Sequence, residues 1–205
     1  MKIYDIACLY GIIKSRIGTK TRKRDIEKMA TWKSRGLRGS ALEELINRTN
    51  EKYRDEGLAL IQKIPTPITP VEIDQSTRHI TLAYFDQKST VDYIGVVQGV
   101  PVCFDAKESA SETFSLQNIH EHQYKFMEDF EAQGGVAFFL IYYTSIDEFY
   151  YLPFEYLKLF WQRAKEGGRK SFRHDELNPA YIIPRDSDVF VPYLETLKVD
   201  LEDRD

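Results

Sequence analysis

The sequence predicts an α/β or α+β fold built on a β-sheet, and three stretches of the chain support this prediction. The segment 58–64 is apolar and is typical of a buried strand. The segment 90–107 reads as two strands joined by a turn at Gln98-Gly99. The apolar run 136–143 is typical of a strand that is buried on both faces. Helical patterns stand between these strands, so we expect the 90–107 hairpin at the centre of the sheet.

The first predicted helix begins at Ser40. Ser40 and Glu43 match a capping box, in which each side chain accepts a hydrogen bond from the backbone N–H of the other residue. The helix is expected to end near Gly57. Its apolar stripe is formed by Leu42, Leu45, Ile46 and Thr49.

A proline-rich excursion, PTPITP, follows the strand 58–64. Pro65, Pro67 and Pro70 exclude a helix and disfavour a central strand. The segment 71–85 alternates enough to return as a strand. Two strands with a stiff excursion between them would project from the body of the domain. An ordinary long loop is an equally good interpretation of the same residues.

The 90–107 hairpin carries the main chemical signal. Asp105 and Lys107 lie two apart on its second strand and therefore project from the same face. Asp92 lies on its first strand and could join them across the hairpin. Carboxylate oxygens bind hard divalent cations such as Mg²⁺, and a lysine can hold an attacking water or a developing phosphate charge. The alternative interpretation is an Asp–Lys surface pair, which stabilises a protein little.

A helix is expected from Leu116 to Gln133. Gln123 falls on its inward stripe, four residues after Ile119. A polar side chain that faces the interior needs a hydrogen-bond partner, so Gln123 is predicted to meet one. The apolar members of the stripe are Ile119, Phe126, Met127 and Phe130.

The last third of the chain completes the predicted sheet and its helices. Gly134-Gly135 end the preceding helix. The elements expected after them are a strand over 136–143, a strand over 146–152, a helix from Pro153 to Lys165, a basic loop over 167–174 and a final helix over 189–201.

The charge of the chain is distributed unevenly. Residues 1–40 hold eleven basic and three acidic side chains, so this segment carries a charge of +8 while the remainder carries −12 and the whole chain −4. A basic arm on an acidic body is typical of proteins that contact nucleic acid, and a solvated basic tail is the alternative. Residues 1–39 are therefore expected to form a basic, partly mobile N-terminal arm. A second basic cluster consists of Arg163, Lys165, Arg169, Lys170 and Arg173. It is expected to be either a surface that contacts phosphates or a solvated loop.

Several classes of protein are disfavoured. No apolar run is long enough to span a membrane, and no export signal is recognised, so a cytoplasmic location without a membrane partner is expected. Cys8 and Cys103 have no metal-ligand spacing, and a buried reduced thiol is expected at Cys103. His120 and His122 are two apart on a predicted helix and should point in different directions, which argues against zinc.

Five segments, taken in order, resemble one known family. RGSALEELINRTNEKY is similar to the family's first helix, and IQKIPTPITPVEI to the start of its stalk. STVDYIGVVQGVPVCFDAKE is similar to its catalytic hairpin, and TFSLQNIHEHQYKFM to the helix that follows. WQRAKEGGRKSFRHDEL is similar to a late basic segment. The chain therefore resembles the RecU-type Holliday junction resolvases of the PD-(D/E)-x-K nuclease superfamily.

This resemblance implies a set of site residues. Thr90, Asp92, Asp105 and Gln123 fall on the magnesium-site positions of the family, with Mn²⁺ as an alternative metal. Lys107 falls on the lysine that stabilises the transition state. Glu43 matches an acid of the first helix, with a catalytic role as an outer ligand or a capping role. The chain departs from the family in having Asp105 where Glu is expected.

The resemblance also implies an architecture and a set of partners. The expected fold is a restriction-endonuclease-like mixed central sheet flanked by helices, with a nuclease domain over 40–205. A proline-rich stalk at about 65–85 would enter the junction from a homodimer. Four-way junction DNA is the expected substrate and a recombinase a further candidate partner. The expected DNA-binding residues are Arg22, Lys23, Arg24, Arg35, Arg38, Arg169, Lys170 and Arg173.

The function that the resemblance implies is that of a structure-specific endonuclease that resolves Holliday junctions by paired symmetric nicks in DNA recombination and repair. Two alternatives remain open. One is another endonuclease of the same superfamily, and the other is a protein that binds junctions or a recombinase without cutting.

Overall fold

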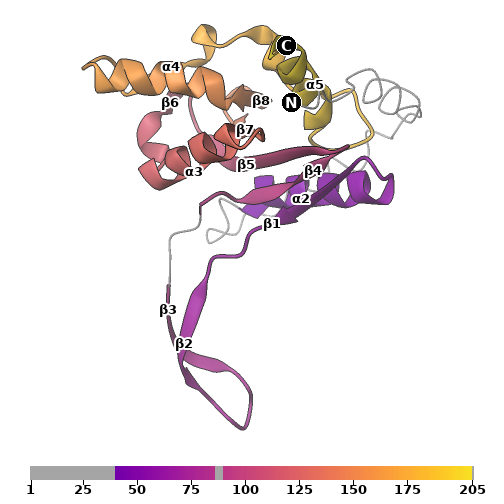
Figure 1. Cartoon of the computed structure of the whole chain (residues 1–205), viewed down its shortest axis with the longest axis vertical. Helices are drawn as coiled ribbons and strands as arrows, with labels where there is room; N and C mark the ends of the chain where they lie inside the picture. Colours follow the sequence, from indigo (N-terminus) through magenta and orange to yellow (C-terminus); the bar gives the residue numbers. More distant parts are fainter. Residues whose placement is uncertain (1–39, 86–89, 205) are drawn as a thin grey trace.

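The computed structural model describes residues 40–85 and 90–204 and contains one five-stranded sheet with helices on both faces (Figure 1). The strand order across the sheet is β1-β4-β5-β7-β8. These strands are β1 (Ala59–Lys63), β4 (Tyr93–Val97), β5 (Val100–Ser109), β7 (Val136–Tyr143) and β8 (Glu148–Pro153). The helices are α2 (Ser40–Asp55), α3 (Glu121–Ala132), α4 (Phe154–Lys165) and α5 (Tyr193–Asp203).

The sheet is mixed, with β5 at its centre. β5 pairs with β7 in parallel, whereas the β1–β4, β4–β5 and β7–β8 pairs are antiparallel. A parallel neighbour requires a crossover connection, and α3 lies in the segment that joins β5 to β7. The prediction of a mixed central sheet flanked by helices, with the hairpin in its middle, is confirmed.

The turn between β4 and β5 explains the Gln98-Gly99 pair. Gln98 has φ 46° and Gly99 has φ 92°, and a two-residue hairpin turn with both φ values positive matches the twist of the strands it joins. Gln98 also donates a side-chain hydrogen bond of 2.7 Å to the Gly57 carbonyl, which fixes the turn to the end of α2. The hairpin therefore holds β5 in a defined register.

Aromatic packing fixes α2 and α5 against one face of the sheet. The Phe104 ring on β5 stacks 4.7 Å from Tyr93 on β4 and 4.8 Å from Phe138 on β7. Tyr193 of α5 lies 5.3 Å from Phe104 and 5.4 Å from Tyr53 of α2. These five rings are buried, so this face of the sheet is a closed core.

The opposite face carries α3 and α4. Tyr124 of α3 packs against both Phe154 and Trp161 of α4, with ring centroids 5.0 Å and 4.7 Å apart. Residues of β5 that alternate with Phe104, beginning with Asp105, point toward this second layer. None of the described helices is long and apolar enough to cross a membrane.

Two local predictions were wrong in detail. The helix expected from Leu116 is split into a 3-10 turn, η1 (Leu116–Asn118), and α3, because Ile119 and His120 are extended between them. The basic loop expected over 167–174 contains a short strand, β9 (Ser171–Arg173), which pairs with another short strand, β6 (Thr113–Ser115). Strands of three residues have no detectable periodicity, and these two are held by the stacking of Phe114 on Phe172 at 5.1 Å.

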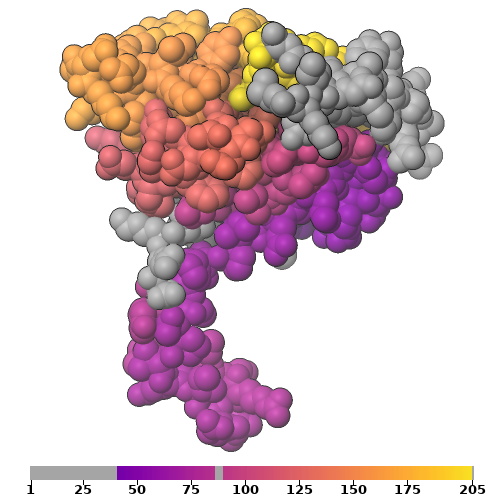
Figure 2. Space-filling view, viewed as in Figure 1, coloured from indigo at the N-terminus to yellow at the C-terminus, as the bar shows by residue number. Residues whose placement is uncertain are grey.

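The proline-rich segment forms a separate two-stranded sheet. β2 (Ile68–Ile73) and β3 (Ile80–Phe85) pair antiparallel, and they extend away from the five-stranded sheet as a projecting hairpin (Figures 1 and 2). Exposed apolar side chains cover this hairpin, so it buries little of its own surface. They are Ile68, Val71, Ile73, Ile80, Leu82, Tyr84 and Phe85.

Candidate active site

Asp105 lies at the centre of the candidate site, on the middle strand of the sheet. Asp105 is fully buried, which is rare for an aspartate and requires compensating partners. Lys107 lies two residues further along β5 on the same face and forms an ion pair with Asp105 Oδ2. The Lys107 side chain keeps 21% of its surface exposed. The lysine therefore connects the buried carboxylate to the surface of the protein.

Asp92 joins this pair from the adjacent strand. It lies immediately before β4 rather than within it, because β4 begins at Tyr93. Asp92 Oδ2 accepts a hydrogen bond of 3.0 Å from the backbone N–H of Ala106 on β5. A carboxylate thus continues the ladder where the backbone pairing of the two strands has ended. This bond draws Asp92 toward Asp105, as the sequence predicted.

Gln123 supplies the second direct contact to the buried acid. Its Nε2 donates a hydrogen bond of 2.9 Å to Asp105 Oδ1, and its Oε1 accepts one of 3.1 Å from the backbone N–H of His120. Gln123 is the third residue of α3 and His120 its N-cap, so the Oε1 bond satisfies a free N–H at the helix start. The expectation that the inward Gln123 meets a polar partner is confirmed.

Burial and a second carboxylate control the protonation of Asp105. Burial raises the pKa of Asp105 to about 7, the neighbouring Lys107 lowers it, and the nearby Asp92 carboxylate raises it again. Two carboxylates that close together in a dry site cannot both ionise without a compensating positive charge. Lys107 provides one such charge, and the arrangement favours a second.

The donor set fits a hard divalent cation. Asp105 Oδ2 is buried and has no hydrogen-bond partner among the described residues, although it is ion-paired to Lys107. A buried carboxylate oxygen that accepts no hydrogen bond and lies beside a second carboxylate matches the all-oxygen ligation that Mg²⁺ prefers. Among the described residues, no three His, Cys, Asp or Glu side chains gather to hold a metal. Thr90, which is partly buried, remains a predicted ligand.

The geometry of Gln123 bears on its predicted ligand role. Its carbonyl oxygen already accepts the His120 bond, and its amide nitrogen faces Asp105. In this arrangement Gln123 orients the acid rather than offering an oxygen to the metal. A contact from Gln123 to the metal would therefore run through water or require the amide to turn.

Glu43 is placed on the other face of the sheet. Its carboxylate forms an ion pair with Lys63, the last residue of β1. Lys63 is the cross-strand partner of Tyr93, and Tyr93 that of Phe104, so all three project away from Asp105. The structure thus places Glu43 near Glu108, the other acid of β5, and on the face opposite Asp105. Its catalytic role stays a prediction without geometric support.

The predicted DNA-binding residues divide into two groups. Arg169 pairs with Glu176 at 3.0 Å and Arg173 with Asp175 at 2.7 Å, so neighbouring acids partly neutralise this cluster. Lys170 is exposed. The arm residues lie outside the described part of the chain, and they are Arg22, Lys23, Arg24, Arg35 and Arg38.

Two smaller predictions concern histidine and cysteine. His120 and His122 were expected to point apart, but their rings stack 5.3 Å apart with an interplanar angle of 12°. The expectation failed because His120 precedes α3 as its N-cap, so the two residues are not separated by helical geometry. Cys103 is buried as a free thiol, as expected, and burial raises its pKa. Cys8 lies outside the described residues.

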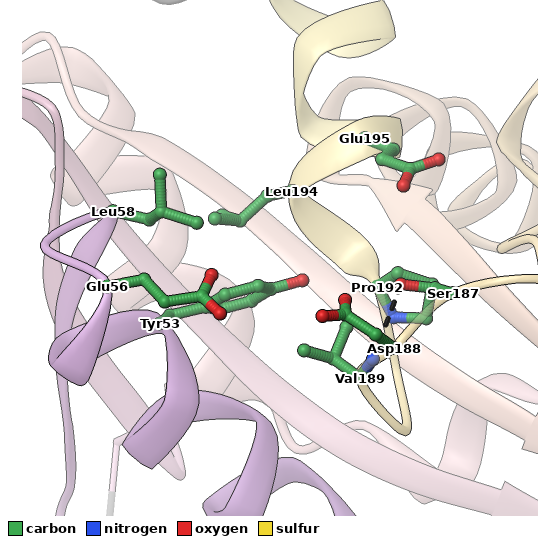
Figure 3. A pocket seen from close by; sticks show the side chains of 9 residues that line it. All are labelled: Tyr53, Glu56, Leu58, Ser187, Asp188, Val189, Pro192, Leu194 and Glu195. Carbon is green, nitrogen blue, oxygen red and sulfur yellow. Dashed lines mark hydrogen bonds between the residues drawn. The ribbon is translucent and has the colours of Figure 1, made fainter. Parts of the chain in front are cut away.

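A small hollow between α2 and α5 is lined by acidic and apolar side chains (Figure 3). Glu56, Asp188 and Glu195 surround the buried Tyr53 there. Its volume is about 10 Å³, which is room for about one water. This hollow is therefore too small for a substrate.

Comparison with known families identifies the family of this chain. Residues 37–199 match the family model described as "Recombination protein U", RecU. The chain belongs to the RecU family. The match includes β4, β5 and α3, the elements around which the candidate site is built.

Individual RecU proteins are similar over most of their length. Each of the following is named Holliday junction resolvase RecU. The protein of Bacillus licheniformis is 41% identical over 78% of this chain and 81% of its own. The protein of Bacillus pumilus is 43% identical over 80% of this chain and 78% of its own, and that of a Geobacillus species is 42% identical over 69% and 73%.

Two supporting groups of this RecU chain escaped the sequence reasoning. They are the backbone N–H groups of Ala106 and His120, which hold Asp92 and Gln123 in place. The His120 contact had a detectable signal, since a Gln three residues after a helix N-cap is the second half of a capping box. The Ala106 contact had none, because it depends on the residue at which β4 begins.

Proposed function

We propose that this protein is a Mg²⁺-dependent endodeoxyribonuclease that resolves four-way DNA junctions by paired symmetric nicks in recombination and repair. The observation that carries the proposal is the convergence of Asp92, Asp105 and Lys107 on one face of the central sheet. Membership of the RecU family, whose similar members are named Holliday junction resolvases, supports the choice of substrate. A cytoplasmic location remains a prediction from the sequence.

The reaction is hydrolysis of a phosphodiester. A water oxygen forms a bond to phosphorus, the bond from phosphorus to the leaving oxygen breaks, and the leaving oxygen receives a proton. The attacking water loses a proton as its bond to phosphorus forms, which balances the proton that the leaving oxygen gains. Bond formation and bond breaking place more negative charge on the phosphate and leaving oxygens than the ground state holds, so stabilising that charge is the main task of the site. Specificity would come from junction shape and phosphates rather than from base edges.

Each residue has a distinct part in this reaction. Asp92 and Asp105 would hold Mg²⁺, which supplies a Lewis acid that lowers the pKa of water and neutralises charge on the leaving oxygen. Lys107 would orient the attacking water or stabilise the negative charge that develops on the phosphate. Gln123 positions Asp105 through its 2.9 Å bond. Loss of one charge-stabilising group of this kind typically lowers a rate by about 10²–10³-fold.

A homodimer suits this task, because two equivalent strands of a junction must be cut symmetrically. The β2–β3 hairpin supports this part of the proposal. It projects from the domain and exposes Leu82 at 50%, Tyr84 at 55% and Phe85 at 76% of their surfaces. Large exposed apolar patches mark protein interaction sites. The hairpin would serve both as part of the dimer contact and as the stalk that enters the junction.

The basic arm would add binding energy through phosphate contacts. Its charge of +8 over residues 1–40 supports this role. A recombinase is a further candidate partner, because the resemblance to the family implies one. The alternative functions are a non-cleaving junction- or recombinase-binding protein and another endonuclease of the superfamily.

Cleavage of a labelled synthetic four-way junction with Mg²⁺, beside a linear duplex of equal length, tests the proposal. We expect symmetric paired nicks in the junction and little cutting of the duplex. Junction binding without nicks would favour the non-cleaving alternative. Equal cutting of both substrates would favour a different endonuclease.

A further inference from the structure

A groove opens between α3 and α4, next to the candidate active site. Its volume is about 570 Å³, within the range of about 300–1,000 Å³ that is usual for ligand sites. Its lining comes from the first two turns of α3, the residue that caps α3 and the second half of α4. The lining residues are His120, Glu121, His122, Tyr124, Lys125, Glu128, Trp161 and Lys165.

Flat rings form much of this lining. Trp161 stacks on Tyr124 at 4.7 Å with an interplanar angle of 16°. His120 and His122 form a second parallel stack at 5.3 Å. Parallel rings beside an open groove offer π-faces on which a nucleobase of any sequence can stack. All four residues line the same groove, so the two stacks are presented together.

The groove also contains a cation that no described carboxylate pairs with. Lys165 is exposed, and its Nζ lies 5.8 Å from the Tyr124 ring centroid. Lys125, by contrast, is engaged with Glu128 at 2.9 Å and Asp129 at 3.1 Å. The remaining acid, Glu121, lies in the first turn of α3, where the helix dipole stabilises a negative charge. Lys165 is therefore the group that can take a phosphate.

One helix, α3, carries both the groove lining and the contact to the candidate active site. Gln123 bonds Asp105 on the inner side of α3, and its neighbours His122 and Tyr124 line the groove. The backbone N–H of His120 also bonds Gln123 Oε1. Since an α-helix is about 10–12 Å across, the groove begins about one helix diameter from Asp105. A DNA strand has about 3.4 Å per nucleotide, so this distance corresponds to about three nucleotides.

We propose that the α3–α4 groove binds an unstacked nucleotide of the substrate DNA strand, about three nucleotides from the phosphate that is cut. Its base stacks on the ring faces of the groove and its phosphate contacts Lys165. This inference rests on the proposed function, because it takes junction DNA as the substrate. It adds a strand-binding site that is separate from the acids and from the basic arm.

Photo-cross-linking tests the position of the strand. The full-length protein is mixed with four-way junctions in EDTA, which prevents cutting, and each junction carries 5-bromodeoxyuridine at one position near the cleavage site. We expect cross-linked peptides from α3 or α4 when the label lies two to four nucleotides from that site. Cross-links that never reach these helices would overturn the inference.

Binding measurements test the energy of the contact. A protein with both His122→Ala and Lys165→Ala is expected to bind the junction about tenfold more weakly, with a salt slope smaller by about one unit. Arg54→Ala is the matched control, since Arg54 is 61% exposed at the end of α2 on the opposite face. Trp161→Phe keeps a ring in the stack and is expected to retain binding. Unchanged affinity and slope in the double variant would contradict the inference.

These outcomes are distinct from failure of the proposed function. If the wild-type protein nicks junctions but the groove variants bind normally, only the groove assignment is lost. If the wild-type protein binds junctions without nicking and the groove cross-links, the nuclease proposal fails together with the stated distance to a cut phosphate, while strand binding in the groove stands. If the groove instead takes a protein partner, neither cross-linking nor the salt slope will respond to these substitutions.

Discussion

Gln123 Nε2 lies 2.9 Å from Asp105 Oδ1, and the same side chain accepts a hydrogen bond from the N-cap residue of its own helix. The start of α3 is thereby connected to the central strand of the sheet through one amide. A buried carboxylate is costly unless it is hydrogen-bonded. This contact therefore orients Asp105 and helps to make its burial tolerable.

Replacing Gln123 with alanine should weaken catalysis without abolishing it. Residues that orient a ligating carboxylate typically change metal affinity or activity by about 10–100-fold. We expect the rate of junction cutting to fall by that amount and the Mg²⁺ concentration needed for half-maximal cutting to rise. Gln117→Ala, at an exposed residue in the 3-10 turn before α3, should leave both values unchanged. A normal metal requirement in the Gln123 variant would remove its positioning role.

The raised pKa of Asp105 predicts how metal-free stability depends on pH. The pKa of Asp105 is about 7 in the folded protein, against an ordinary value of 3.8, so between these values the folded state binds a proton that the unfolded state has lost. Stability from this group is therefore present at low pH and is lost as pH rises toward 7. At pH 8 without metal, Asp105→Asn should raise the free energy of unfolding by about 2–4 kcal/mol.

Thermal denaturation in EDTA at pH 5.5 and pH 8 measures this effect. The wild-type Tm should fall more steeply with pH than that of Asp105→Asn, and Mg²⁺ at pH 8 should raise only the wild-type value. Parallel pH profiles for the two proteins would show that ionisation of Asp105 does not destabilise the folded protein as we predict.

Polar substitutions on the β2–β3 hairpin should weaken the proposed dimer. Leu82→Ser combined with Phe85→Ser removes two of its exposed apolar side chains. Loss of central apolar anchors typically costs an interface at least about tenfold in affinity. Light scattering should show dissociation at concentrations where the wild-type protein is dimeric. Leu159→Ser is a matched control, because Leu159 is 67% exposed but lies on α4. Equal masses for both variants would exclude the hairpin from the dimer contact.

Deletion of residues 1–35 should reduce DNA binding and its salt dependence. Each phosphate contact contributes about −0.9 to the slope of log K against log salt concentration for duplex DNA. Loss of the basic arm is therefore expected to make the slope shallower by several units, as measured by titration at three salt concentrations. A slope equal to that of the full-length chain would leave the arm without a role in DNA binding.

The sequence predicts the β4–β5 hairpin well because its signals are local. Alternating apolar residues and a Gln98-Gly99 turn determine β4 and β5, and the two-residue spacing of Asp105 and Lys107 determines their common face. Gln123 could likewise be found from helical periodicity. These features need no knowledge of the tertiary structure.

Other parts of the site depend on contacts between distant segments. Glu43 lies three residues after Ser40 whether it caps the helix or acts as an outer metal ligand, so the sequence cannot separate these two roles. Only the register of β1 against β4 reveals that Glu43 pairs with Lys63 across the sheet from Asp105. The partners of Arg169 and Arg173 follow from a 3-10 turn, η2 (His174–Glu176), that no pattern predicted. The groove was also missed, since the ring stack of Tyr124 and Trp161 requires α3 and α4 to be adjacent.

The most direct test of the cleavage centre is the junction assay on Asp92→Ala and Lys107→Ala beside the wild-type protein, with binding measured on the same samples. Because both residues act on charge that develops during cutting, each variant should lose symmetric nicking by about 10²–10³-fold or more while still binding the junction. Cutting by both variants at the wild-type rate would contradict the assignment of the site to this face of the sheet.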